Sequence, residues 1–263
     1  IALDPKGEIK TAKLLSENAD QYADAALEAI RALMGTPPDQ AIDHKAIKSV
    51  KMGTTVATNA LLERKGERTL LVITKGFKDA LKIGYQARPR LFDLNIILPE
   101  QLYEKVLEVD ERIGARGEII TALDLTSLEK PMKKAFASGI SSIAIVTMHG
   151  YRYSDHEKKI AALASEIGFS QISTSFETSP LMKLIGRGDT TVVDAYLSPI
   201  LRRYIDRVQN ELEGVPLYFM QSNGGLASAD HFQGKDAILS GPAGGIVGAV
   251  KTAALSGYSK IIG

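Results

Sequence analysis

Short apolar runs alternate with amphipathic helical segments along most of this chain, and that alternation constrains the fold more than any other feature. Apolar runs of strand length stand at Thr69–Ile73, Ile143–Met148 and Leu217–Met220, between segments whose apolar residues recur at helical spacing. Strands that alternate with helices favour an α/β fold with a largely parallel or mixed sheet. A chain of 263 residues is also long enough for two domains or subdomains.

The same patterns predict the remaining elements. We expect a β-hairpin over Ile1–Leu15 and strands at Ile47–Met52, Lys105–Ile113 and Ile172–Ser175, with the start of a further strand at Lys260–Gly263. We expect helices from a cap at Asn18 to Met34, at Val56–Arg64, at Phe77–Ile83 and at Pro242–Ser256, two helices opened by capping boxes at Thr126–Glu129 and Ser154–Glu157, and a long helix at Thr190–Glu213 that is broken or kinked at Pro199. The segment Tyr85–Glu100 is expected to be irregular. A boundary near Glu177–Gly188 divides the chain into a first lobe, residues 1–185, and the start of a second, residues 186–263.

Composition excludes several classes of function. Lys and Arg total 32 against 31 acidic residues, so the net charge of +1 gives no reason to expect a nucleic-acid or anionic-membrane partner. The chain has no cysteine, which excludes disulfides, thiolate catalysis and sulfur-ligated metals and leaves a cytoplasmic setting as the expectation. The histidines stand without metal-ligand spacing and are expected to be structural or at the surface: His44, His149, His156 and His231.

A first polar cluster, Gly53–Asn59, lies between a predicted strand and a predicted helix. A strand-to-helix turn presents free backbone N–H groups and the positive end of a helix to an anion or a polar ligand. Three hydroxyls and one carboxamide make the surface neutral and rich in hydrogen bonds, so Thr54, Thr55 and Asn59 are candidate binding residues. The alternative is that Thr54 or Thr55 only caps the helix.

A second cluster, Gln221–Gly225, directly follows the apolar strand Leu217–Met220. Ligands in open α/β sheets bind at the carboxyl ends of strands, which makes Ser222, Asn223 and Gly224 candidates. Since Asn-Gly is a common turn dipeptide, a tight turn is the alternative.

A third cluster, Ser240–Gly248, lies at a predicted loop-to-helix junction. Its glycines allow close backbone approach, and Gly241, Gly244 and Gly245 are the candidates. The segment is neither a P-loop nor a dinucleotide fingerprint. Packing of the glycines against another helix is the alternative.

Taken in order, several segments resemble the hydantoinase A/5-oxoprolinase family and together cover nearly the whole chain. They are Gly53–Gly66, Thr74–Asp79, Arg88–Asp93, Thr190–Pro199, Met220–Gly225 and Ser240–Gly245. The resemblance implies an actin-like ATPase fold, of the Hsp70 and sugar-kinase type, that is incomplete within these residues. It also implies ATP and Mg²⁺ as cofactors of the full-length enzyme, and hydrolysis of a cyclic amide such as a hydantoin or 5-oxoproline after phosphorylation of the amide oxygen.

The resemblance, combined with position, gives the candidate residues their roles. Thr54, Thr55 and Asn59 would line the cleft, Ser222, Asn223 and Gly224 would lie at a strand end that faces it, and the three glycines of the third cluster would approach the nucleotide by backbone. The catalytic residue stays unknown. A small cyclic amide and a hydantoinase B-like subunit are the partners that the family implies.

This sequence also departs from the family pattern. Both phosphate loops of the family, Asp/Gly/Gly/Thr turns, would lie outside residues 1–263, so we expect these residues alone to be inactive. Met182–Arg187 stands where the family usually has a Glu-containing stretch, and Asp194 where Asn is more usual. Arg187 is expected to be a surface cation, and Asp189 is expected to cap a helix.

Two alternatives to this function stay open: a subunit of an ATP-dependent acetone- or acetophenone-type carboxylase, and a nucleotide-binding module without turnover.

Overall fold

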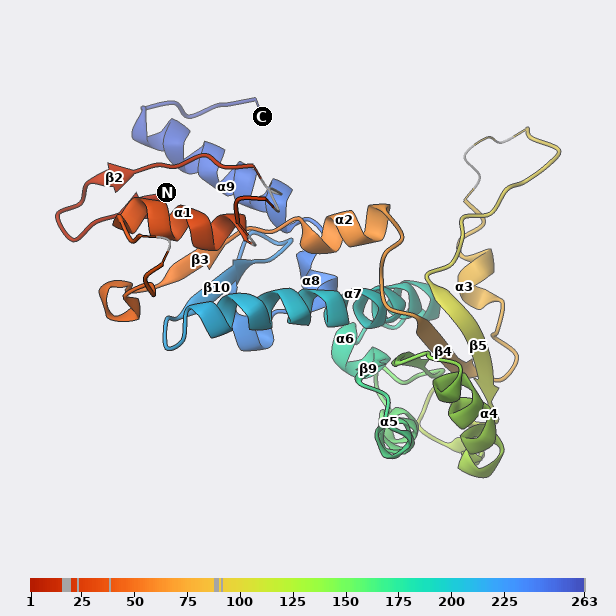
Figure 1. Cartoon of the computed structure of the whole chain (residues 1–263). Coiled ribbons are helices and arrows are strands. Elements are labelled where there is room, and N and C mark those ends of the chain that lie inside the picture. Colours follow the sequence, from red (N-terminus) through yellow and green to blue (C-terminus); the bar gives the residue numbers. More distant parts are fainter. Residues whose placement is uncertain (16–19, 23, 38, 88–89, 91, 263) are drawn as a thin grey trace.

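The computed structural model describes residues 1–15, 20–22, 24–37, 39–87, 90 and 92–262, and two sheets organise them. One sheet has the strand order β5-β4-β8-β9 and the other β11-β10-β3. Figure 1 shows the first sheet with α4 and α5 at one end of the molecule and the second sheet with α1 and α9 at the other, with the long helix α7 running between them.

The elements are short except for α7. The strands are β1 Ala2–Leu3, β2 Ile9–Lys10, β3 Val50–Met52, β4 Thr69–Thr74, β5 Tyr103–Val109, β6 Arg112–Ile113, β7 Ile119–Thr121, β8 Ser142–Val146, β9 Gln171–Thr174, β10 Leu217–Met220 and β11 Leu226–Ser228. The helices are α1 Ala25–Met34, α2 Val56–Leu62, α3 Ala80–Ile83, α4 Leu125–Ala137, α5 Asp155–Ile167, α6 Ser175–Thr178, α7 Leu184–Glu211, α8 Gly234–Ala237 and α9 Ser240–Leu255, with 3-10 turns η1 His44–Ala46 and η2 Ala229–His231.

All four strands of the larger sheet are parallel, because β4 pairs in parallel with both β5 and β8, and β8 pairs in parallel with β9. Every residue of β4 and β8 is buried. Alternate side chains point to opposite faces, so Leu70 and Val72 pack with α4 and α5, while Leu71 and Ile73 pack with α3 and α7. The continuous apolar runs in the sequence are therefore strands that are covered on both faces.

Helix α7 continues through Pro199 as one helix, where the sequence pattern predicts a break or kink. A proline cannot donate to the carbonyl four residues earlier, which here belongs to Ala195. The hydroxyl of Ser142 on β8 donates to that carbonyl instead. The neighbouring Tyr196 carbonyl also accepts a bond from the backbone N–H of Glu67. Contacts from β8 and from the segment that precedes β4 thus bond to the backbone of α7 near its proline.

Several predicted boundaries are wrong for local reasons. Helix α1 begins at Ala25, and the carboxylate of Asp24 caps it by accepting from two backbone N–H groups; the predicted cap Asn18 lies outside the described residues. Asp124 rather than Thr126 caps α4. No strand forms over Lys260–Ile262 in the described part of the chain. Arg88, Pro89 and Leu91 lie outside the described residues.

The expectation of an α/β fold with parallel and mixed sheets is confirmed. The division at residue 185 stays a prediction; β3, which precedes it, lies beside β10, which follows it. None of the helices among the described residues has the length and apolar character needed to cross a membrane.

Candidate functional site

The first two polar clusters follow two neighbouring strands. Strands β3 and β10 pair in parallel, with Val50 opposite Leu217 and Met52 opposite Phe219, so their carboxyl ends lie at the same edge. The chain then continues into Gly53 from β3 and into Gln221 from β10. Parallel pairing thus brings together two clusters that are far apart in sequence.

The third cluster closes over the first. The backbone N–H of Thr54 donates to Ser240 Oγ at 3.3 Å, and the hydroxyl of Thr58 donates to the Ile238 carbonyl. A Cβ atom on Gly241 would stand 3.0 Å from the Thr55 methyl carbon. The start of α9 therefore lies directly against the start of α2.

The two threonines of the first cluster have different roles. Thr54 is 6% exposed, and its hydroxyl accepts a bond from the Val56 backbone N–H at 3.2 Å, so the capping alternative applies to Thr54. Thr55 is exposed and makes no side-chain capping bond. Asn59, one turn further along α2, is exposed, and its side chain makes no hydrogen bond to another described residue. Thr55 and Asn59 thus remain available to a ligand.

The second cluster forms a tight turn, which is the alternative that its Asn-Gly dipeptide suggested. The Asn223 carboxamide oxygen accepts from the Gly225 backbone N–H at 2.7 Å, and Gly224 has φ +84°. The turn joins β10 to β11, an antiparallel strand that the sequence pattern did not predict. The Ser222 hydroxyl donates to the Asp236 carbonyl at 2.7 Å and accepts from the Leu239 N–H at 3.0 Å, so it holds the turn against the segment that enters α9.

The glycines of the third cluster lie inside α9, which begins at Ser240. In a helix, the amides of Gly244 and Gly245 are bonded along the axis, whereas the amide of Gly241 lies in the first turn, where N–H groups have no intrahelical acceptor. A Cβ on Gly244 would stand 3.8 Å from Met220, so this glycine packs against β10 rather than against another helix. A Cβ on Gly245 would meet no described atom within 4 Å, so that face of α9 is open.

Among the described residues, the groups without a partner at this edge are uncharged donors: the Thr55 hydroxyl, the Asn59 carboxamide and the first-turn N–H of Gly241 at the start of a 16-residue helix. The N-terminal end of a helix favours negative charge through its dipole, so an anion is the ligand that we expect at this surface. We call the surface formed by Thr55, Asn59, Asn223, Gly241 and Gly245 the β3/β10 edge.

A second carboxyl edge, that of the larger sheet, is closed by buried charges. Glu157 and Arg187 are 0% and 1% exposed. Glu157 Oε1 accepts from the Thr147 N–H at 2.8 Å and from the Ser175 hydroxyl, and Oε2 accepts from the Phe176 N–H at 3.1 Å. Burial raises the pKa of Glu157, and these donors together with the Arg187 guanidinium oppose that rise.

Arg187 fixes the segment that precedes α7. Its Nη1 donates to the Leu181 carbonyl at 2.7 Å, its Nη2 to the Thr147 carbonyl at 2.6 Å and its Nε to Ser175 Oγ at 2.9 Å. The expectation of a surface arginine is therefore wrong, and Asp189 lies inside α7 rather than at its cap. The predicted capping box at Ser154 is also wrong, because Glu157 turns inward to the sheet.

A buried histidine completes this closed edge. His156 Nδ1 lies 2.6 Å from Glu111 Oε2, and the Thr74 hydroxyl donates to the other oxygen of Glu111. The sequence does contain a signal for these residues: His156 and Glu157 stand on the same helical stripe as the buried Ile160 and Ala164. The prediction that His156 is structural agrees with this placement. In the described ranges, no three His, Cys, Asp or Glu side chains lie together as metal ligands would.

Comparison with known families places nearly the whole chain. Residues 1–168 match the model of the hydantoinase/oxoprolinase N-terminal region, and residues 187–263 match the hydantoinase/oxoprolinase model. A 5-oxoprolinase from Dictyostelium discoideum is 43% identical over 91% of this chain, which covers 22% of that protein. The caprolactamase subunit alpha of Pseudomonas jessenii is 31% identical over 73% of the chain, which covers 29% of that protein. The chain thus spans between a fifth and a third of the length of these relatives.

Two solved structures share the fold. The ATP-dependent caprolactamase from Pseudomonas jessenii superposes with a TM-score of 0.74 at 27% identity, over 88% of this chain and 35% of its own. A nucleotide-free acetone carboxylase gives a TM-score of 0.74 at 21% identity, over 89% and 35%. The expectation of an actin-like ATPase fold is confirmed.

Proposed function

This chain belongs to the hydantoinase/oxoprolinase family, and we propose that it forms part of the nucleotide-binding region of an enzyme that uses ATP to hydrolyse a cyclic amide. The observation that carries the proposal is the β3/β10 edge, where uncharged donors from three distant segments meet at the carboxyl ends of parallel strands. The likeness to a 5-oxoprolinase and to an ATP-dependent caprolactamase supports the choice of reaction.

The chemistry accounts for the need for ATP. A lactam carbonyl is a poor electrophile, and transfer of the γ-phosphoryl group of ATP to the amide oxygen turns that oxygen into a good leaving group. A first water then adds to the carbonyl carbon and the ring C–N bond breaks, which frees the amine and leaves an acyl phosphate. A second water hydrolyses the acyl phosphate to a carboxylate and free phosphate. In this proposal the Thr55 hydroxyl, the Asn59 carboxamide and the Gly241 N–H donate to phosphate oxygens. Thr54 and Ser222 keep the supporting segments in place through the hydrogen bonds described above.

Mg²⁺ offsets phosphate charge in reactions of this class. Because the described residues hold no cluster of three potential ligands, we assign no residue of this chain to the metal. The relative named caprolactamase subunit alpha supports a partner subunit, and we propose one of the hydantoinase B type. A cytoplasmic setting stays a prediction from composition.

Substitution of Asn59 tests the proposal. In the enzyme that contains this chain, Asn59→Ala removes a donor to a charged phosphate and is expected to lower kcat/KM for ATP-dependent ring opening about 10- to 100-fold. The thermal midpoint should stay close to that of the parent. Asn210→Ala, an equivalent change at an exposed position of α7, is the matched control.

Ring opening and phosphate release are measured together over a panel of hydantoins and lactams, and a parallel assay supplies a ketone with bicarbonate. Coupled ring opening that falls only in Asn59→Ala supports the proposal. Ketone carboxylation without ring opening replaces it with the carboxylase alternative, and nucleotide binding without turnover of either substrate replaces it with the non-catalytic one.

A further inference from the structure

The proposed function does not use the segment between α3 and β5. Figure 1 shows this segment standing away from both sheets, at the end of the molecule opposite α9. We call Arg90 and residues 92–100 the arm. Each residue of the arm is exposed, and none of them belongs to a helix or a strand. The side chains of the arm are therefore accessible to a binding partner.

The backbone of the arm is also open to pairing. From Phe92 to Leu98, no described residue makes a hydrogen bond to another described residue. The arm is tied to the protein at its second end, where Arg64 Nη2 donates to the Glu100 carbonyl at 3.3 Å. Unpaired N–H and C=O groups of an exposed segment are a template for pairing with another chain.

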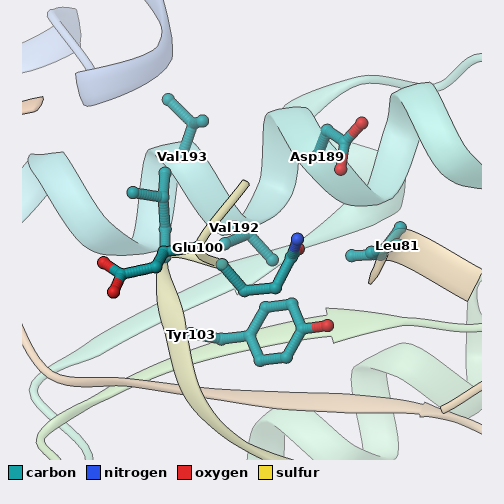
Figure 2. A pocket seen from close by; sticks show the side chains of 8 residues that line it. Leu81, Glu100, Tyr103, Asp189, Val192 and Val193 are labelled. Atoms are coloured by element: carbon teal, nitrogen blue, oxygen red, sulfur yellow. The ribbon is translucent and has the colours of Figure 1, made fainter. Parts of the chain in front are cut away.

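The two ends of the arm carry opposite charges. Glu100 and the three residues after it line a cavity of about 180 Å³ against α7. Figure 2 shows that the Glu100 carboxylate points away from the Tyr103 ring and from Asp189. Neither Glu100 nor Arg90 makes an ion pair with a described residue. The arm therefore presents an available anion at one end and an available cation at the other.

The residues between these charges alternate with the period of a strand. In an extended chain, alternate residues lie on the same face. The even-numbered residues of the arm place a cation, four large apolar side chains and an anion on one such face: Arg90, Phe92, Leu94, Ile96, Leu98 and Glu100. Phe92 and Leu94 are 96% and 104% exposed. An exposed apolar row of this kind is typical of an interaction surface.

We propose that the arms of two copies of this chain pair as antiparallel strands across a two-fold axis at Asn95. In that register, Phe92 lies opposite Leu98 of the second copy, and Leu94 lies opposite Ile96 of the second copy. Because a two-fold contact uses the same surface on both copies, each of these apolar pairs forms twice. The apolar row is thus complementary to itself.

The charges complete the same register. Arg90 lies opposite Glu100 of the second copy, so one pair of opposite charges closes each end of the apolar row. A shift of one residue would place Leu94 opposite Asn95 and lose the match between apolar faces. The arrangement of charges and apolar residues therefore favours a second copy of this chain as the partner.

The register also agrees with the position of Pro99. Opposed residues of antiparallel strands alternate between hydrogen-bonded and non-hydrogen-bonded pairs. If the Asn95 pair on the axis is of the second kind, every odd-numbered residue is in a pair of the second kind, and Pro99 is one of them. Since proline has no N–H to donate, that is the position where a strand tolerates it.

The size of the contact predicts a weak dimer. Each copy contributes four large apolar side chains, which is less than the about 800 Å² per partner of a standard interface. The arm also has to become ordered when it pairs, and this ordering lowers the affinity. We expect a dissociation constant of about 10–100 µM.

Single cysteines test the register, because the 263-residue chain has none of its own. Asn95→Cys places two cysteines in a non-hydrogen-bonded pair, where Cα atoms about 4.5 Å apart allow a disulfide. We expect a disulfide-linked dimer under mild oxidation. Asp93→Cys lies opposite Ile97→Cys, so the two variants should crosslink when mixed and not alone. Asn210→Cys, at an exposed position of α7, is the matched control.

Sedimentation equilibrium measures the strength of the dimer over concentrations that bracket the expected constant. Leu94→Asp should weaken it at least tenfold, because the change removes two apolar pairs. Leu255→Asp, the same change at an exposed position of α9, should have no effect. Arg90→Glu and Glu100→Arg should each weaken the dimer about tenfold, and the double variant should return it close to the parent.

A chain that stays monomeric at every concentration would overturn the proposal. So would equal disulfide yields from Asn95→Cys and Asn210→Cys, or crosslinking of Asp93→Cys with itself as readily as with Ile97→Cys, since both indicate association without a register. Circular dichroism checks that each variant is folded. The measurements use no nucleotide and no substrate, so their outcome leaves the proposed function to be judged by its own assay.

Discussion

The described residues form two carboxyl edges of parallel strands, and these edges have opposite characters. At the edge of the larger sheet, Glu157 and Arg187 are buried, and each is bonded to the backbone of neighbouring segments. At the β3/β10 edge, Thr55 and Asn59 are exposed and carry no charge. The first edge uses its polar groups to hold its own loops together, whereas the second leaves them available.

The difference shows what a strand-end rule can and cannot decide. Ligands in open α/β sheets bind at the carboxyl ends of strands, yet both edges meet that condition. What separates them is whether the polar groups already have partners within the protein. Among the described residues, no buried side-chain nitrogen or oxygen lacks a hydrogen-bond partner, so the charges of the closed edge are fully satisfied.

The largest expected effect comes from opening the closed edge. Arg187→Ala leaves the Glu157 carboxylate buried without a cation and removes donors from the carbonyls of Leu181 and Thr147. We expect the free energy of unfolding to fall by about 3–5 kcal/mol in denaturant titrations. Arg203→Ala is the matched control on the same helix, since Arg203 makes an exposed ion pair with Glu67 at 3.1 Å.

That control should lose at most about 1 kcal/mol, as exposed ion pairs do. Equal losses in the two variants would contradict the view that Arg187 belongs to a buried network.

A pair of glycines compares the two edges directly. A Cβ on Gly150 would overlap Glu157 Oε1 and stand 2.8 Å from Thr147 Oγ1, whereas a Cβ on Gly245 meets no described atom within 4 Å. Gly150→Ala should therefore lower the free energy of unfolding by about 1–3 kcal/mol. Gly245→Ala should leave it unchanged or raise it by up to about 1 kcal/mol, because alanine favours a helix interior. Thermal unfolding of both variants provides the comparison, and a clear loss of stability in Gly245→Ala would show that its face of α9 is not open.

The smallest expected effect concerns Asp189, whose carboxylate, unlike that of Glu157, accepts no hydrogen bond from a described residue. Burial raises the pKa of Asp189 as it does that of Glu157, but no described residue bonds to Asp189. A raised pKa means that the folded state holds the proton more tightly than the unfolded chain does. The contribution of Asp189 to the stability of the parent therefore falls as pH rises from about 3.9, the ordinary pKa of Asp, through the pKa of Asp189 in the folded state.

Asp189→Asn removes that dependence, so its advantage over the parent should grow through this pH window and then stay level. Urea titrations at a series of pH values measure the difference. A difference that does not change with pH would show that Asp189 titrates alike in the folded and unfolded states.

Sequence patterns predicted the features that short stretches of chain decide. Strands β4, β8 and β10 stood out because burial on both faces makes their residues continuously apolar. The strand ends at the β3/β10 edge were predicted too, since polar clusters directly follow apolar runs. The roles of Thr55, Asn59 and Gly245 as ligand contacts stay predictions.

The features that were missed depend on distant partners. The pattern around Ser154–Glu157 is the same whether Glu157 bonds to its own helix or to Thr147 and Ser175, and only the fold makes the second choice available. Local patterns also competed at α4, where Asp124 caps the helix two residues before the predicted Thr126.

The most direct test of the central claim is the response of backbone amide NMR signals of the 263-residue chain to Mg·ATP. The account predicts weak binding, with shifts concentrated at Thr55, Asn59 and Gly241 and none at the closed edge around Thr147 and Ser175. Shifts that cluster at the closed edge, or no shifts at the β3/β10 edge at saturating nucleotide, would contradict the claim that this edge faces the phosphates.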